Sequence, residues 1–263
     1  MIDGYLALLG LPRRGPSLDY LFELHRAQVE RVPYSNLDIV LGNPVPIDPA
    51  ASVARILAGR GGYCFHLNGA MSWLLRELGF AVSLHEGYVA TASNPDAAEV
   101  NHLLLLVHDL GDHAWIFDVG LGDGLHEPMP LRIGVHKQGP FRYKLAHTGR
   151  RWRFTHDETG SFEYMEFESA GTTMDAFEEP HRRLSTADDS PFRKVLTAQI
   201  RGADRVSIVR GCTWLDIGAA GREERTLEEF EEWSSRLAAL HLTGFEELWP
   251  RTREAHEAWL LTR

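Results

Sequence analysis

The sequence predicts an α+β protein, because its helix-like and strand-like segments fall in separate parts of the chain. In the first third, apolar residues recur at the three- and four-residue spacing of a buried helix face. From residue 81 onward, strand-like runs follow one another, and the segment after Pro191 mixes both patterns. Helices and strands do not alternate, so the pattern argues against a parallel βαβ sheet.

Three helices are expected in the first third. The first covers residues 17–30 and the second residues 50–57, each with apolar residues at helical spacing. The third is the clearest, with an apolar stripe that runs from Leu67 to Leu78. Gly79 then stands where a C-terminal cap is expected.

Strands are expected through the middle and again in the tail. The middle candidates are residues 81–91, 100–108, 114–119, 141–146, 151–155 and 162–167. Beyond Pro191, a short helix-like segment precedes strand candidates at residues 205–210 and 212–217. Thr226 and Glu229 have capping-box spacing and predict an acidic helix, and a last helix is expected over residues 245–261. We interpret the acidic stretch over residues 223–232 as a solvated helix face.

Composition places the chain among ordinary globular proteins. Its residues are 44% hydrophobic and 24% charged, which is too apolar for disorder. No run approaches the ~18 consecutive apolar residues that a membrane span needs. Asp3 without a preceding basic segment argues against a secretory signal, and Ile2 argues against N-myristoylation. We therefore expect a cytoplasmic protein.

The charge and the cysteines narrow the function further. The chain has 37 acidic and 27 basic residues and a net charge of −10, which disfavours nucleic acid and anionic membranes as partners. Two cysteines, Cys64 and Cys212, are too few for a disulfide framework or a four-thiolate zinc site. A lone thiol with histidines elsewhere is instead a candidate nucleophile.

Cys64 is the stronger of the two candidates. It follows Gly61 and Gly62 and falls in the first turn of the third expected helix. Unpaired backbone amides and the helix dipole favour a thiolate at that position. The apolar stripe of the helix directs Cys64 toward the rest of the protein. The alternative is a small buried structural thiol.

A base and a carboxylate are found on two neighbouring strand candidates. His102 begins a very apolar strand, and Asp118 ends the next one. A hairpin turn centred near Leu110 or Gly111 would place both side chains on one face, where they can touch. An aspartate beside a histidine fixes its tautomer and stabilises the imidazolium that forms when histidine deprotonates a thiol. The alternative for each residue is an ordinary polar group at a strand end.

Other motifs are weak or missing. The segment Gly120–Gly124 lacks the helix and spacing of a dinucleotide fingerprint, so we expect a flexible loop beside the site. The sequence has no Walker loop, no G-x-S-x-G and no H-E-x-x-H. The histidines are scattered, and no metal site is expected.

The segment from Arg60 to Asn68 resembles the R-G-G-x-C-x-E/Q-x-N signature of the arylamine N-acetyltransferases. Four further stretches resemble motifs of that family in the same order along the chain. Residues 31–37 resemble V-P-F-E-N-L, residues 101–104 resemble T-H-L-L, residues 118–122 resemble D-V-G-F-G, and residues 185–192 resemble S-T-x-P-x-S-x-F. Together these stretches extend over most of the chain.

The resemblance implies three parts and a cysteine-protease-like triad between the first two. These parts are a helical domain at residues 1–80, a β-barrel-like domain at residues 81–190 and an α/β lid with C-terminal helices at residues 191–263. The implied triad is Cys64, His102 and Asp118, with the backbone near Leu103 supporting an oxyanion.

The resemblance also implies ping-pong acyl transfer. An acyl group would pass from a thioester such as acetyl-CoA through a cysteine acyl-enzyme to a small-molecule amine, with no permanently bound cofactor and no metal. Thr186 and Ser190 are implied donor-binding residues.

Departures from the family pattern fall around the implied site. Tyr34 and Leu121 replace phenylalanines of the acceptor pocket, and Ser35 and His66 replace carboxylates or amides. A pocket with one aromatic wall fewer offers less stacking to a flat arylamine and more room for a bulky acceptor. The loop of residues 93–99, near the implied donor cleft, contains two carboxylates, Asp96 and Glu99, which would repel the phosphates of CoA.

Two alternatives remain open. One is an amide synthase that releases and cyclises a polyketide from an acyl carrier protein as a macrolactam. The other is a thiol hydrolase or transglutaminase-like enzyme, which shares the Cys, His, Asp order. A catalytically silent member would keep only the fold.

Overall fold

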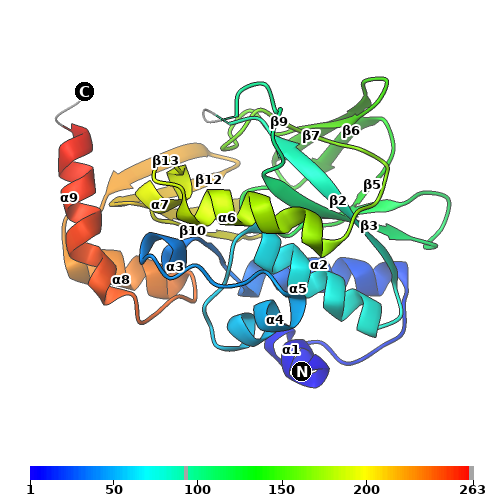
Figure 1. Cartoon of the computed structure of the whole chain (residues 1–263), viewed down its shortest axis with the longest axis horizontal. Helices are drawn as coiled ribbons and strands as arrows, with labels where there is room; N and C mark the ends of the chain where they lie inside the picture. Colours follow the sequence, from blue (N-terminus) through cyan, green and yellow to red (C-terminus); the bar gives the residue numbers. More distant parts are fainter. Residues whose placement is uncertain (92–93, 261–263) are drawn as a thin grey trace.

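The structure is a computed structural model that describes residues 1–91 and 94–260, apart from the side chain of residue 259 (Figure 1). Its first part is helical: α1 is Ile2–Leu9, α2 is Leu18–Arg31, α3 is Leu37–Val40, α4 is Pro49–Leu57 and α5 is Cys64–Glu77. The three predicted helices are thus confirmed as α2, α4 and α5, whereas α1 and α3 were not predicted.

Local signals in the sequence explain where these helices begin and end. The Ser17 side chain accepts a hydrogen bond from the Tyr20 N–H at 3.2 Å and caps α2. Asp48 caps α4 in the same way. After α5, Gly79 has a φ of +91°, a left-handed conformation that favours glycine and closes the helix as predicted.

An antiparallel sheet of eight strands forms the middle of the chain, in the order β5-β4-β3-β2-β9-β8-β7-β6. Its strands are β2 (Ala81–Val89), β3 (His102–His108), β4 (Trp115–Phe117), β5 (Met129–Pro130), β6 (Gly134–Gln138), β7 (Phe141–His147), β8 (Trp152–Thr155) and β9 (Tyr164–Phe167). All six predicted middle strands are confirmed. Strand β5 has only two residues and β6 has a single apolar side chain, Val135, so neither shows an apolar pattern, and neither was predicted.

Strand β3 is apolar on both faces because both are covered. Leu103 and Leu105 belong to the core cluster of the helices, whereas Leu104 and Leu106 belong to a second cluster inside the eight-stranded sheet. The run of leucines therefore reflects burial on two sides. This arrangement fixes β3 between α5 and the sheet interior.

The tail forms a second antiparallel sheet in the order β1-β10-β11-β12-β13. It follows η1 (Met174–Phe177), α6 (Glu178–Thr186) and α7 (Pro191–Lys194), and contains β10 (Thr197–Arg201), β11 (Arg205–Arg210), β12 (Thr213–Gly218) and β13 (Gly221–Thr226). Its remaining strand, β1 (Tyr34–Ser35), comes from the helical part. One face of this sheet packs against the eight-stranded sheet through residues such as Ile208 and Ile217. The other face packs on α8 (Phe230–Ala239) through residues such as Val209 and Trp233.

The capping box predicted at Thr226 is wrong. Thr226 pairs with Thr213 at the end of β13, and α8 starts only at Phe230. The acidic run is therefore partly an edge strand, on which exposed charges deter pairing with other chains, so its interpretation as one helix face is also wrong. The predicted last helix is divided into η2 (Glu246–Leu248) and α9 (Trp249–Leu260).

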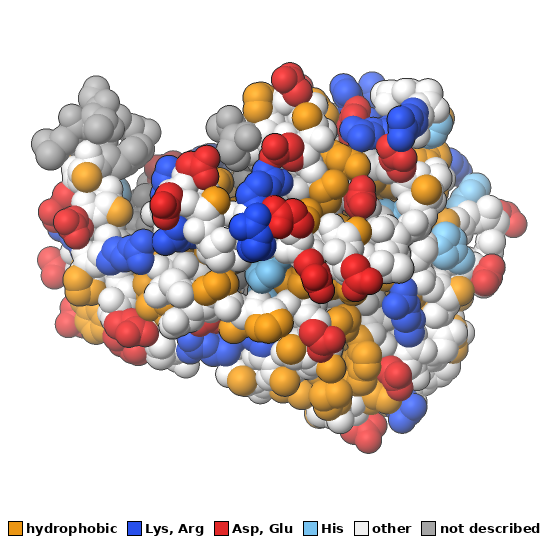
Figure 2. All heavy atoms as spheres, in the orientation of Figure 1, with side chains coloured by type: hydrophobic (Ala, Val, Ile, Leu, Met, Phe, Trp, Pro, Cys, Tyr) orange, Lys and Arg blue, Asp and Glu red, His pale blue; other side chains and the backbone are white. Residues whose placement is uncertain are grey.

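Figure 1 shows the helices α1, α2, α4 and α5 below the eight-stranded sheet, with α8 and α9 at the left, beside the tail sheet. On the face in Figure 2, acidic and basic side chains are interspersed. Within the described residues, no helix is long and apolar enough to cross a membrane. The division of the chain at residues 80 and 190 stays a prediction.

Candidate active site

Cys64 is the first residue of α5, and only 3% of its surface is exposed. The loop before it is held closely against the chain near β1. At Gly61, where φ is +62°, a Cβ would lie 2.5 Å from the carbonyl oxygen of Pro33. Gly62 forms a parallel bridge with Tyr34. The two glycines thus fix where α5 begins, and Cys64 lies among the free backbone amides of the first helical turn.

His102 and Asp118 meet through the hairpin formed by β3 and β4. Leu105 pairs with Phe117, a register centred on Gly111, so the predicted turn is confirmed. This register makes His102 and Asp118 diagonal neighbours on one face of the sheet. The Nε2 of His102 lies 2.7 Å from Oδ2 of Asp118, and both residues are buried.

The protonation of His102 follows from these contacts. Burial disfavours the imidazolium, but the Asp118 charge, its hydrogen bond and a hydrogen bond with Cys64 outweigh burial and raise the pKa of His102 to about 10. At neutral pH the ring is therefore a cation beside the sulfur atom. The Cys64 sulfur also lies 3.7 Å from the carbonyl oxygen of Asn101. The three predicted triad residues are thus in contact.

Asn68 is a site residue to which sequence reasoning gave no role. One turn after Cys64 on α5, its Nδ2 donates hydrogen bonds to Asp118 Oδ1 at 2.8 Å and to the Leu103 carbonyl oxygen at 2.6 Å. Its Oδ1 accepts a hydrogen bond from the Val119 N–H at 3.0 Å. Asn68 therefore ties α5 to both strands of the hairpin. Its position four residues after Cys64, on the same helix face, was the available signal.

Gly120 allows this close approach. A Cβ at Gly120 would lie 2.6 Å from the Nδ2 of Asn68 and 2.7 Å from the Cα of Cys64. Any side chain there would push the end of the hairpin away from α5. The segment Gly120–Gly124 does lie beside the site, as predicted, because Gly120, Leu121 and Asp123 line the cavity next to Cys64.

A cavity of about 540 Å³ opens onto Cys64 and His102 between the two sheets. Tyr34 and Leu121, the two predicted acceptor-pocket residues, both line it. The other apolar lining residues include Val89, Phe162, Leu184, Phe192, Ile208, Leu215 and Ile217. Burial and the nearby Cys64 and Asp123 raise the pKa of Tyr34 far above its usual value, so its phenol stays protonated. Asn101, Gln199 and Arg210 are among the polar lining residues, so the lining of the cavity is mixed.

Known proteins are similar to this chain in sequence and in fold. A family model described as N-acetyltransferase matches residues 17–240. Over 148 residues, 54% of this chain, the sequence is 37% identical to an arylamine N-acetyltransferase / N-hydroxyarylamine O-acetyltransferase of Salmonella typhimurium. This chain belongs to the arylamine N-acetyltransferase family. The match spans 52% of the Salmonella protein, about half its length.

Solved arylamine N-acetyltransferase structures extend the similarity over nearly the whole chain. The Mycobacterium smegmatis protein matches with a TM-score of 0.85 and 26% identity over 92% of both chains. The Mycobacterium marinum protein, solved in complex with CoA, matches with a TM-score of 0.84 and 25% identity over 97% of this chain and 99% of that one. The predicted fold class, α+β with a barrel-like eight-stranded sheet, is thus confirmed as the arylamine N-acetyltransferase fold.

The hydroxyls of the two predicted donor-binding residues form hydrogen bonds within the α6–α7 segment. Thr186 Oγ1 donates to the Arg182 carbonyl oxygen at 2.7 Å, and Ser190 Oγ donates to the Leu184 carbonyl oxygen at 2.5 Å. Neither residue lines the cavity, and Ser190 is buried. Donor binding by Thr186 and Ser190 stays a prediction. Leu103 lies on β3 next to His102, and the oxyanion role of its backbone also stays a prediction.

The other departures from the arylamine N-acetyltransferase motifs lie away from the cavity. Ser35 Oγ lies 3.4 Å from the Arg60 carbonyl oxygen, and His66 Nε2 lies 3.2 Å from that of Val45. Burial and the nearby Arg55 lower the pKa of His66 to about 3, which keeps it neutral.

The donor-side loop is less acidic than the sequence suggested. Glu99 forms an ion pair with Arg183 on α6, which compensates its charge. Asp96 lies in the same loop and is exposed. Only one of the two carboxylates is therefore without a cation beside it in the described structure.

Replacing Asn68 with alanine should destabilise the protein and loosen the active site. The change leaves the Val119 N–H and the Leu103 carbonyl oxygen buried without these partners, at a cost of about 3 kcal/mol. The free energy of unfolding in urea measures this. Ser72→Ala, also on α5, is the control, because the Ser72 hydroxyl donates to the Gly69 carbonyl oxygen of the same helix. Equal stabilities of the two variants would contradict the role of Asn68.

Proposed function

We propose that the protein transfers an acyl group from a thioester such as acetyl-CoA to a small-molecule amine, through an acyl-enzyme on Cys64. The observation that carries this proposal is the buried His102–Asp118 pair, 2.7 Å apart, beside the Cys64 sulfur at the start of α5. Family membership and the cavity next to Cys64 support it.

In the acylation step, the Cys64 thiolate attacks the thioester carbonyl carbon. Backbone amides near Cys64 and Leu103 stabilise the oxyanion of the tetrahedral intermediate. The intermediate collapses, the bond to the donor sulfur breaks, and the His102 imidazolium gives its proton to that sulfur. The products are a free thiol, neutral His102 and acylated Cys64.

In the second step, the amine nitrogen attacks the acylated Cys64 while neutral His102 accepts the amine proton. The bond between sulfur and the acyl carbon breaks, the amide leaves, and the thiolate–imidazolium pair is restored. Asp118 keeps the ring oriented and stabilises its charge in both steps. We also propose that the protein acts in the cytoplasm.

Intact-protein mass spectrometry tests the proposal directly. Mixing with acetyl-CoA should add one acetyl group to the protein, and a suitable amine should then remove it as an amide. Loss of the acetyl group to water at a rate independent of amine would favour the hydrolase alternative. A protein that never becomes acylated would be the silent member of the family.

The size of the cavity at Cys64 leaves the amide synthase alternative open. Its 540 Å³ volume and the leucine at position 121 leave space for an acyl chain larger than acetyl. If the protein is an amide synthase, small arylamines should be poor acceptors, and a bulky thioester that carries its own amine should be converted instead. Prompt turnover of acetyl-CoA with small arylamines would exclude this alternative.

Restoring an aromatic wall should favour arylamines. Leu121→Phe adds a stacking surface to the cavity and should raise the second-order deacylation rate with an aminobenzoate by roughly 2- to 10-fold. The same change at exposed Ile133, outside the cavity, should have no effect. A Leu121→Phe variant that is slower with arylamines would refute this account of the pocket.

A further inference from the structure

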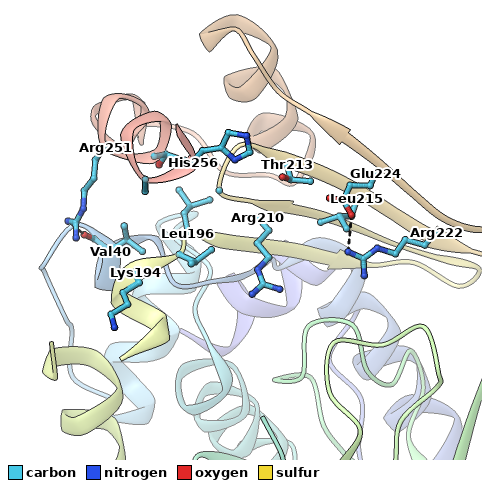
Figure 3. Close-up of a pocket in the computed structure, with 14 residues that line it drawn as sticks. Val40, Lys194, Leu196, Arg210, Thr213, Leu215, Arg222, Glu224, Arg251 and His256 are labelled. Atoms are coloured by element: carbon cyan, nitrogen blue, oxygen red, sulfur yellow. Dashed lines mark hydrogen bonds and ion pairs between the residues drawn. The ribbon is translucent and has the colours of Figure 1, made fainter. Parts of the chain in front are cut away.

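One row of side chains on the tail sheet forms part of the wall of the cavity at Cys64. The row contains one cross-strand partner from each strand: Tyr34, Gln199, Ile208, Leu215 and Glu224. Cross-strand partners share a face of the sheet, and the first four line the cavity. Figure 3 shows the β13 end of the row, where Glu224 pairs with Arg222 at 3.0 Å. At the β1 end, Tyr34 and Gln199 are both polar.

The carboxamide of Gln199 is buried without a hydrogen-bond partner. Only 7% of the residue is exposed, and its Oε1 lies against Gly122, where a Cβ would be 2.7 Å away. Neither Oε1 nor Nε2 forms a hydrogen bond with any residue that the structure describes. Turning the carboxamide over exchanges its oxygen and nitrogen. Gln199 can therefore present either a donor or an acceptor to the cavity.

The Tyr34 phenol is a second polar group without a partner beside Gln199. Its hydroxyl forms no hydrogen bond with the described part of the chain. Burial raises the pKa of Tyr34 far above its usual value, so the phenol keeps its proton and can donate it to a ligand. The arylamine N-acetyltransferase motif has phenylalanine at this position, so the hydroxyl is a departure from that motif.

We infer that Tyr34 and Gln199 together bind a neutral hydrogen-bonding group, a carboxamide or a hydroxyl, on the molecule that enters the cavity. The inference rests on the proposed function, and either the acyl chain or the amine can carry this group. A buried polar group without a partner is unfavourable, and a ligand that pairs with Gln199 removes that cost. Neither side chain brings a charge, so the pair matches a neutral ligand group.

A pair of amines of equal shape tests whether the amine carries this group. The carboxamide of 3-aminobenzamide and the isopropyl group of 3-isopropylaniline are similar in size, but only the first forms hydrogen bonds. The ratio of their second-order deacylation rates should fall roughly 3- to 10-fold in Gln199→Met and in Tyr34→Phe. Comparing ratios cancels the different reactivity of the two amines. Tyr164→Phe, at a half-buried tyrosine outside the cavity, is the control and should keep the ratio of the unmodified protein.

A pair of donors tests whether the acyl chain carries the group instead. The preference for 3-hydroxybutyryl-CoA over butyryl-CoA in the acylation of Cys64 should then fall by a similar factor in Gln199→Met and Tyr34→Phe. A reduced ratio in either experiment supports the site and identifies the molecule that carries the group. Ratios that match the unmodified protein in both experiments would overturn the inference.

Two further measurements separate this inference from the proposed function and from a structural role. If no donor acylates Cys64, the proposed function fails, and an NMR titration still decides the inference: 3-aminobenzamide should bind the unmodified protein more tightly than Gln199→Met. The urea midpoint of Gln199→Met should equal or exceed that of the unmodified protein, because an apolar chain of similar size replaces an unpaired amide. A lower midpoint would show that the fold itself uses the carboxamide and would overturn the inference.

Discussion

Replacing Cys64 with serine should abolish acyl-enzyme formation and leave the fold intact. Serine has the shape of cysteine with a smaller atom in place of sulfur, so the buried side chain at the start of α5 should still fit. A serine hydroxyl is far less acidic than a thiol, and the neighbouring imidazolium does not ionise it. Acylation by acetyl-CoA should fall on the order of 10⁴-fold or more, measured by intact mass and by release of free CoA thiol.

Cys212 supplies the control for this prediction. It is fully buried in the turn between β11 and β12, and burial raises the pKa of its thiol to about 11. The thiol therefore stays protonated at neutral pH and is a poor nucleophile. Cys212→Ala should acylate at the normal rate. Activity that survives in Cys64→Ser but disappears in Cys212→Ala would mean that Cys212, and not Cys64, is the nucleophile.

The triad geometry could be predicted because it depends on local rules. The helix start at Cys64 follows from the two glycines before it and the apolar stripe after it. The meeting of His102 and Asp118 follows from one hairpin register, which the odd loop around Gly111 determines. Both inferences need only neighbouring parts of the chain.

The missed features depend on contacts between distant segments. Tyr34 pairs with Gln199 across the molecule, and two residues of strand leave no periodic pattern to detect. The acidic run at Glu223 resembles a helix face in sequence, because pairing with β12, and not its own composition, makes it a strand. A second cavity likewise joins side chains from α7, the tail sheet and α9, which no local pattern brings together.

The charge state of His102 could not be predicted from the sequence alone. The sequence predicts a carboxylate near His102, but it does not show whether burial or ion pairing determines the pKa of His102. In the structure, pairing with Asp118 outweighs burial and raises that pKa. Asn68 adds to this balance by donating to the second oxygen of Asp118, which holds the carboxylate in line with the ring. The orientation of the triad is therefore built into the junction of α5 with the hairpin.

Asp118→Asn should keep the fold and reduce acylation on the order of 10³- to 10⁴-fold, because the His102 imidazolium loses its partner. With that charge removed, burial dominates, and the pKa of His102 falls from about 10. The ring is then neutral at a lower pH than before, so at neutral pH no cation stabilises the Cys64 thiolate. Alkylation of Cys64 by iodoacetamide should therefore shift to higher pH.

His102→Ala should shift the alkylation profile in the same direction, since it removes the cation itself. Asp204→Asn, at an exposed aspartate in the turn between β10 and β11, is the control and should leave the profile unchanged. Alkylation profiles that coincide for the unmodified protein, Asp118→Asn and His102→Ala would break the triad. In that case the amides at the start of α5 would stabilise the thiolate alone, without His102.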